Sequence, residues 1–126
     1  MKKWFYHFVL VLFLSACSYG ADSPNLKGSN FESVVDGVTI TLSFDAEEQR
    51  AYGKVANRYM SSYEINGSQI TFTQAAMTMM MPIGNAAEVE HNYFKFFNDV
   101  KTFELKNDVL ILKDSSGKEM RFTKVN

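Results

Sequence analysis

Several features are scarce or missing in this chain of 126 residues, which has one cysteine and two histidines. A single cysteine excludes a disulfide within the domain, so the fold has to be stabilised by its apolar core. The formal net charge is −1 and no basic cluster occurs, which argues against a nucleic-acid partner. The chain has no glycine-rich phosphate loop and no histidines or carboxylates at metal-ligand spacing. We therefore expect neither an enzyme nor a cofactor.

The N-terminus has the pattern of a secretory signal. Two lysines precede an apolar run from Trp4 to Leu14, which is shorter than the ~20 residues that span a bilayer. The residues Leu14-Ser15-Ala16-Cys17 resemble a bacterial lipobox, which implies cleavage before Cys17 and acylation of that cysteine. The alternatives are an ordinary secretory peptide with an incidental cysteine, or an anchor helix that is never cut.

This interpretation divides the chain into a lipoprotein signal peptide (1–16), a flexible tether (17–30) and one domain (31–126). The tether is rich in turn-forming residues and has no apolar period. Ser18 replaces the aspartate typical of inner-membrane retention, so we expect the lipid to hold the protein on the outer membrane, facing the periplasm.

Most of the domain has the two-residue apolar period of β-strands. Phe31–Val35 and Val38–Phe44 flank Asp36-Gly37, and Tyr59–Ile65 and Gln69–Thr73 flank Asn66-Gly67, so two hairpins are predicted. Three more short strands are predicted in a meander near the C-terminus, around Phe103 and Leu105, Val109–Leu112, and Met120 and Phe122.

One helix is predicted between these two groups of strands, over about Ala86–Asp99. Asn85 is its expected N-cap with Glu88 three residues on, and apolar residues recur at helical spacing. The resulting aromatic stripe is expected to pack on the sheet as core. In the alternative, Tyr93, Phe94 and Phe97 form an aromatic groove that binds a partner.

Several short motifs follow one another in an order that resembles the META domain of the heat-shock HslJ-like proteins. The match runs from Phe31 to Phe122. The motifs are Gly53-Lys54-Val55-Ala56-Asn57-Arg58-Tyr59, Ser62-Tyr63, Ala76-Met77-Thr78-Met79-Met80-Met81-Pro82, Glu90 with Tyr93-Phe94, Leu110-Ile111-Leu112, and Gly117 with Phe122. The resemblance implies an α+β, mainly antiparallel fold: a small barrel-like sheet or half-barrel with one amphipathic helix inserted before the last strands.

The chain departs from the family pattern at two positions. Family members commonly have cysteines where this sequence has Ala56 and Pro82, so a link between those positions is excluded here. Asn57 lies beside the first of these positions. We expect it to bond the backbone at a turn, in a structural role.

The methionine-rich stretch from Met77 to Met81 has two interpretations. Because thioethers are soft ligands, Met77, Met79 and Met81 on one face of a strand, together with His91, would suit Cu(I). In the other interpretation, methionine fills irregular core space beneath the helix. The family resemblance favours the second, so no metal site is assigned.

The expected function is non-enzymatic binding by a lipid-anchored envelope protein. The resemblance implies a role in envelope stress, with heat-shock induction and tolerance of certain antibiotics. The expected partners are the membrane, through the N-terminal lipid, and an envelope protein. The sequence gives no indication of an oligomeric state.

Overall fold

The fold was analysed in a computed structural model, which describes residues 25–125. The predicted signal peptide, the lipidation site Cys17 and the first part of the predicted tether lie outside the described residues. No helix in the described range is long and apolar enough to cross a membrane.

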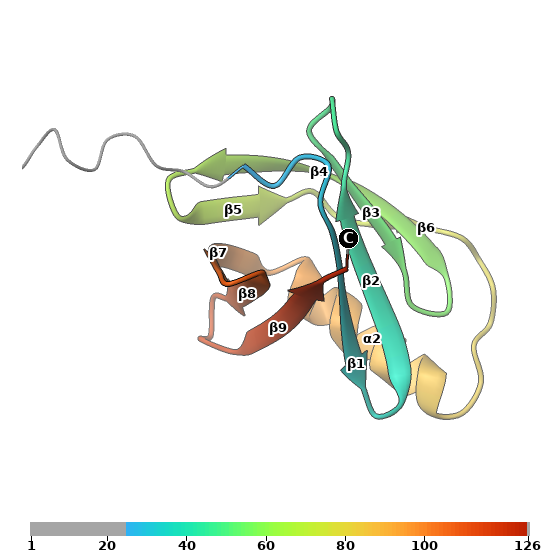
Figure 1. Cartoon of the computed structure of the whole chain (residues 1–126). Coiled ribbons are helices and arrows are strands. Elements are labelled where there is room, and N and C mark those ends of the chain that lie inside the picture. The colour runs from blue at the N-terminus through green and yellow to red at the C-terminus, as the bar shows by residue number, and fades with distance from the viewer. Residues whose placement is uncertain (1–24, 126) are drawn as a thin grey trace, which may run out of the picture.

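Nine strands and one helix make up the described part of the chain (Figure 1). They are β1 (Asn30–Val35), β2 (Val38–Phe44), β3 (Arg50–Lys54), β4 (Arg58–Asn66), β5 (Gln69–Phe72), β6 (Ala76–Met77), α2 (Asn85–Phe97), β7 (Val100–Lys106), β8 (Val109–Asp114) and β9 (Glu119–Lys124).

Eight of these strands close into an antiparallel barrel. The strand order is β3-β2-β1-β9-β8-β7-β5-β4, and β3 also pairs with β4, which closes the ring. The short strand β6 pairs with β4 on the same side as β5, at Tyr59 and Met60. The expected small antiparallel barrel with one helix before its last strands is therefore confirmed.

Tight turns join consecutive strands at Asp, Asn and Gly residues, as the sequence predicts. Asp36 and Gly37 both have positive φ (49° and 79°), as do Asn107 and Asp108 (51° and 66°). Two successive residues of positive φ match the twist of antiparallel strands, which is why such turns favour Asn, Asp and Gly. Gly67, with φ of 66°, completes the turn between β4 and β5.

The helix α2 packs its apolar face against several strands of the barrel and runs behind β1 and β2 in Figure 1. Phe97 stacks on Phe72 of β5 (ring centroids 4.2 Å apart), and Tyr93 lies edge-on to Phe122 of β9. The helix thus joins strands from separate parts of the barrel in one core.

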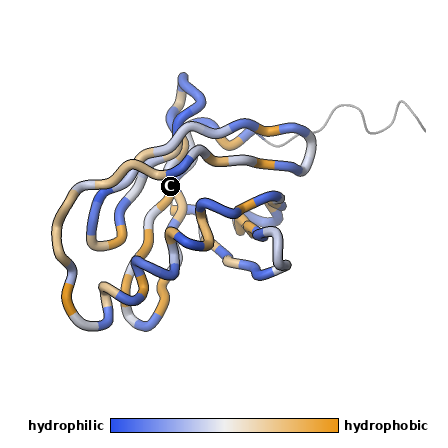
Figure 2. The backbone as a smooth tube through the Cα atoms, turned by 180° about the vertical axis from the view of Figure 1, so that it is seen from behind, coloured by the Kyte–Doolittle hydropathy of each residue, from blue (hydrophilic) through white to orange (hydrophobic). Residues whose placement is uncertain are grey.

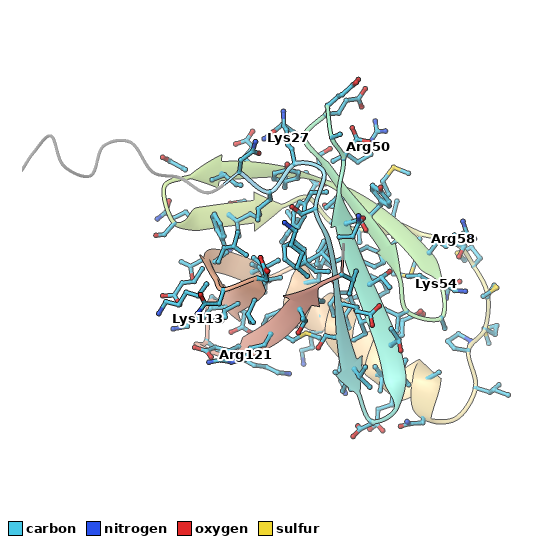
Figure 3. All side chains as sticks on the ribbon, in the orientation of Figure 1. Lys27, Arg50, Lys54, Arg58, Lys113 and Arg121 are labelled. Atoms are coloured by element: carbon cyan, nitrogen blue, oxygen red, sulfur yellow. The ribbon has the colours of Figure 1, made fainter. Side chains whose placement is uncertain are left out.

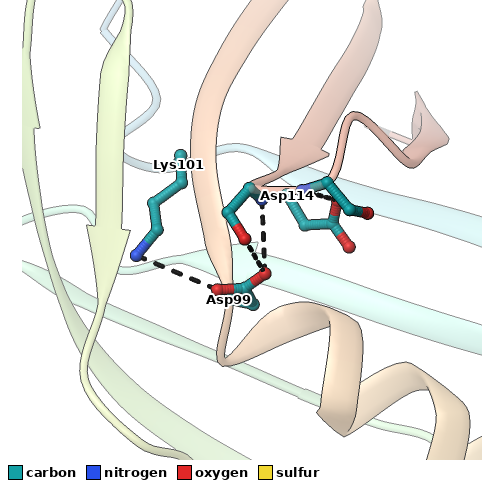
Figure 4. A network of polar contacts seen from close by, with 5 residues as sticks. Asp99, Lys101 and Asp114 are labelled. Atoms are coloured by element: carbon teal, nitrogen blue, oxygen red, sulfur yellow. Dashed lines mark hydrogen bonds and ion pairs between the residues drawn. The ribbon is translucent and has the colours of Figure 1, made fainter.

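Both ends of α2 are attached to turns of the sheet. The N-cap is Gly84, not Asn85; Asn85 is the first helical residue, and its Nδ2 donates to Asp36 O (2.6 Å) instead of capping. The predicted cap was wrong because this amide bonds the β1–β2 turn. After the helix, Asp99 accepts hydrogen bonds from the backbone N–H and hydroxyl of Ser115 (3.3 and 2.6 Å), as Figure 4 shows.

The segment before β1 is part of the domain, which corrects the C-terminal part of the predicted tether. Leu26 is 1% exposed and belongs to the core. Gly28 N–H donates to Phe44 O, and Phe44 N–H donates to Ser29 O, both at 2.9 Å. The tether prediction failed here because one apolar residue, Leu26, packs into the core without any local period to signal it.

Candidate functional site

The aromatic side chains of α2 are interior, not a surface groove. Tyr93, Phe94 and Phe97 are 3%, 6% and 0% exposed, and each ring contacts Tyr59. The prediction that these three residues together form a surface groove for a partner is corrected, because Tyr93 and Phe97 are core residues and Phe94 exposes only a small part of its ring. The expectation that the stripe packs on the sheet as core is confirmed.

Within that core, two tyrosine hydroxyls form a hydrogen-bonded pair. Tyr59 and Tyr93 have their oxygens 2.7 Å apart, and the Tyr59 hydroxyl donates to Thr41 O (2.6 Å). Burial raises the pKa of both phenols above the ordinary value of 10, and for Tyr93 the neighbouring Tyr59 adds to the shift. Both hydroxyls are therefore neutral structural groups around neutral pH.

The segment between β6 and α2 contains the three most exposed large apolar side chains of the described residues. We call residues 78–84 the Met loop; its exposed apolar side chains are Met79 (91%), Met81 (88%), Ile83 (85%) and Met80 (58%). Figure 2 shows it as a long arc on the hydrophobic side of the colour scale. Several exposed apolar side chains close together often mark an interaction site, whereas single exposed apolar residues are common on any protein surface.

This exposure corrects the interpretation of the methionines as core filler. The strand β6 ends at Met77, and the chain then runs outside the barrel to reach the start of α2. The core beneath the helix is filled by aromatic side chains, so no space remains there for Met79 to Met81.

The Met loop is held to the barrel by the buried side chain of Asn57, which is 2% exposed. Its Oδ1 accepts hydrogen bonds from Met80 N–H (2.7 Å) and from the Thr78 hydroxyl (2.8 Å). Its Nδ2 donates to Met80 O (3.1 Å). These three bonds fix the loop's first half, so Met79 and Met80 are presented from a defined backbone.

Glu90 of α2 completes this cluster from the helix side. It is 6% exposed, and its Oε1 accepts hydrogen bonds from the N–H groups of Ala56 (3.1 Å) and Asn57 (2.7 Å). Its Oε2 accepts from Asn57 Nδ2 (2.8 Å). A buried carboxylate is tolerated when several donors surround it, and here three N–H groups do so. We call Asn57, Thr78, Met80 and Glu90 the polar clamp.

Sequence reasoning found only part of this arrangement. It predicted a structural Asn57 bonded to the backbone, which is confirmed by the hydrogen bond from Met80 N–H to Asn57 Oδ1. It missed the pairing of Asn57 with Glu90, which are 33 residues apart in the chain. The only signal was an acidic residue on the aromatic face of the helix.

A groove of about 350 Å³ lies between β6 and α2. Its lining includes Met77 from β6 and His91, Phe94 and Lys95 from α2. The groove adjoins β6 and the helix, and Met77 in its lining directly precedes the Met loop. We treat the groove and the Met loop together as the candidate binding surface.

The alternative Cu(I) site is only partly brought together. Met77 and His91 border the same groove, whereas Met79 and Met81 extend from the exposed loop. The described residues contain no group of three or more His, Cys, Asp or Glu side chains suited to a metal. The thioether site therefore stays an untested alternative, and Cu(I) titration of the wild type, Met79→Leu and Met81→Leu tests it.

A closed antiparallel barrel with one inserted helix is also the fold of a solved protein. The NMR structure of a protein from Burkholderia xenovorans has a TM-score of 0.68 and 17% identity, covering 87% of this chain and 97% of that chain. At that identity the likeness defines the fold alone. The sequence matches none of the curated proteins.

The family is established by a match that covers most of the chain. The family model described as META domain matches residues 23–126, and this chain belongs to the META domain family. The match begins before Leu26, in agreement with a domain that starts ahead of β1.

Proposed function

We propose that this protein is a lipid-anchored component of the bacterial cell envelope that binds an envelope protein through the Met loop and takes no part in catalysis. The observation that carries the proposal is the exposure of Met79, Met81 and Ile83 on a loop whose first half is fixed by the polar clamp. Methionine surfaces adapt to different partner shapes because the thioether chain is flexible and polarizable.

The hydrogen bonding of the buried polar groups supports a binding role. Glu90, Asn57 and the Tyr59–Tyr93 pair are the groups that would otherwise attract a catalytic interpretation. Each is used in hydrogen bonds that hold the barrel, the helix and the loop together. The described buried side-chain polar atoms all have hydrogen-bond partners.

Anchoring at Cys17 is supported by the sequence of the N-terminal segment. Lipidation stabilises membrane attachment by ~0.8 kcal/mol per buried methylene, so two or more acyl chains would hold the domain at the bilayer durably. We place the protein on the outer membrane facing the periplasm, with a role in envelope stress and antibiotic tolerance, as its family suggests. Cys17→Ser is expected to move the protein from the membrane fraction to a soluble or unprocessed form; unchanged retention would contradict the anchor.

Site-specific photo-crosslinking in living cells tests the binding surface. A benzophenone amino acid is placed at Met81 in the full-length protein, and the matched control has the same probe at the exposed Lys113. Figure 3 shows Lys113 on the opposite side of the molecule from Lys54 and Arg58, and Arg58 O accepts a hydrogen bond from Thr78 N–H of the Met loop. We expect a reproducible adduct with one envelope protein from Met81 alone. No adduct, or equal adducts from both positions, would overturn the proposal.

A further inference from the structure

We propose that the partner is held as an added β-strand, in which an extended segment of it pairs with the outward edge of β6 and the first half of the Met loop. The segment would be apolar on one face and would carry an acidic residue near Lys95. This inference rests on the proposed function, since it describes how the same partner is bound at the same surface.

The backbone of residues 75–80 continues the edge of the sheet beyond β6. Thr78 N–H donates to Arg58 O (3.0 Å), and Met80 N–H donates to Asn57 Oδ1 (2.7 Å). In an antiparallel strand, successive residues point their N–H and C=O groups to opposite sides. Because Thr78 and Met80 point toward β4 and Asn57, the backbone groups of Met77 and Met79 point the other way.

The outward side of this edge is closed at one end and open along the rest. Ala75 has the same orientation as Met77, and its N–H donates to Asn98 Oδ1 at the end of α2 (3.1 Å). Beyond Ala75 lies the groove of about 350 Å³ between Met77 and α2. Within residues 25–125, the single strand that pairs with β6 is β4.

The edge is short, since β6 has two residues, but it lacks the other features that usually prevent strand addition. Natural edge strands are protected by charges, bulges or proline. Here no charged residue occurs between Glu64 and Glu88, and Pro82 comes after the available backbone groups. An uncharged edge with free backbone groups is suited to a strand from another chain.

The charges around this edge indicate what the added segment carries. Lys54 and Arg58 lie at the β3–β4 turn near the loop (Figure 3). Lys95 lines the groove. None of the three forms an ion pair with another residue of the described part. The carboxylate of Glu90 also borders the groove, but its oxygens already accept three hydrogen bonds. An acidic residue in the added strand would complement these cations.

The test uses the full chain in dodecyl maltoside micelles and a fluorescein-labelled peptide of alternating valine and threonine that ends in two glutamates. Its matched control is the same peptide N-methylated throughout, which keeps the side chains but has no N–H donors. In the protein, Met79→Pro removes the outward N–H, and Met79→Leu keeps it with a side chain of similar size. Thermal unfolding confirms that both variants fold.

We expect saturable binding of the unmodified peptide to the wild-type protein and to Met79→Leu. Binding should be at least tenfold weaker for Met79→Pro and for the N-methylated peptide. Equal binding of both peptides, no binding at millimolar concentration, or self-association of the chain through Met79 without peptide would overturn strand addition. An in-cell adduct at Met81 that survives Met79→Pro would leave the proposed function standing while this inference fails.

Discussion

Glu90 on α2 accepts hydrogen bonds from both the backbone N–H and the side-chain amide of Asn57, at 2.7 and 2.8 Å, in a site where neither residue is more than 6% exposed. Asn57 in turn bonds Met80 and Thr78 of the Met loop. The helix, the β3–β4 turn and the exposed loop are thus joined through one amide side chain.

Glu90→Gln is expected to destabilise the domain although it preserves size. The new amide NH₂ would face Asn57 Nδ2, placing two donors together, and Asn57 cannot flip without losing its bonds to Met80. An unsatisfied buried polar group costs about 1–3 kcal/mol of unfolding free energy. Urea denaturation measures it, with the exposed Glu88→Gln as control, for which we expect a change within about 0.5 kcal/mol. Equal stability of the two variants would contradict the described hydrogen bonds.

Asn57→Ala is expected to release the Met loop as well as weaken the fold. Met80 N–H loses its acceptor, so its amide hydrogen exchange should accelerate by at least about tenfold, which corresponds to roughly 1.4 kcal/mol of lost protection. Hydrogen exchange read by NMR checks this, and the exposed Asn92→Ala is the control. If Met80 kept its protection in Asn57→Ala, the loop would have to be held by other contacts.

The buried tyrosine pair predicts a loss of stability in alkali. Its folded-state pKa values lie above the unfolded value of 10, so above pH 10 the folded state binds more protons than the unfolded one. The stabilisation is complete below pH 10, and each tyrosine then loses about 1.4 kcal/mol per pH unit up to its folded pKa. Unfolding free energies from pH 8 to 12 should fall less steeply for Tyr93→Phe than for the wild type; parallel curves would count against the pair.

Gly53→Ala is expected to be among the most damaging single substitutions. A Cβ at Gly53 would overlap Thr41 O and come within 2.9 Å of the Tyr59 hydroxyl, which is itself bonded to Thr41 O. Because the obstacle is backbone, we expect a loss of about 3 kcal/mol or more. Gly37→Ala is the comparison: its Cβ meets open space and only its positive φ of 79° is strained. Thermal unfolding should place Gly53→Ala well below Gly37→Ala, and the reverse order would refute the steric account.

The strands and the helix could be predicted because their signals are local. The alternation in β2, the Asn66-Gly67 turn and the three-to-four spacing of Tyr93, Phe96 and Phe97 each depend on neighbouring residues. The strands β3 and β6 gave no such signal. The first is short and contains Gly53, whereas the second has two residues and forms only because β4 offers an edge.

The candidate site was harder to predict because it depends on contacts between distant residues. The composition of Met77–Met81 is the same whether the stretch is buried or exposed, and apolar residues are usually assigned to the core. What decides the outcome is the aromatic filling of the barrel and the bond from Asn57 to Met80, neither of which has a local signature.

The central claim is that the exposed apolar side chains of the Met loop contact an envelope protein. Its most direct test is the in-cell crosslink yield from a probe at Ile83 in the full-length protein. The yield is compared between two double variants: the serine pair, Met79→Ser with Met81→Ser, and the matched leucine pair, Met79→Leu with Met81→Leu. We predict that the leucine pair keeps the adduct and the serine pair loses most of it. Equal yields from the two pairs would contradict the claim.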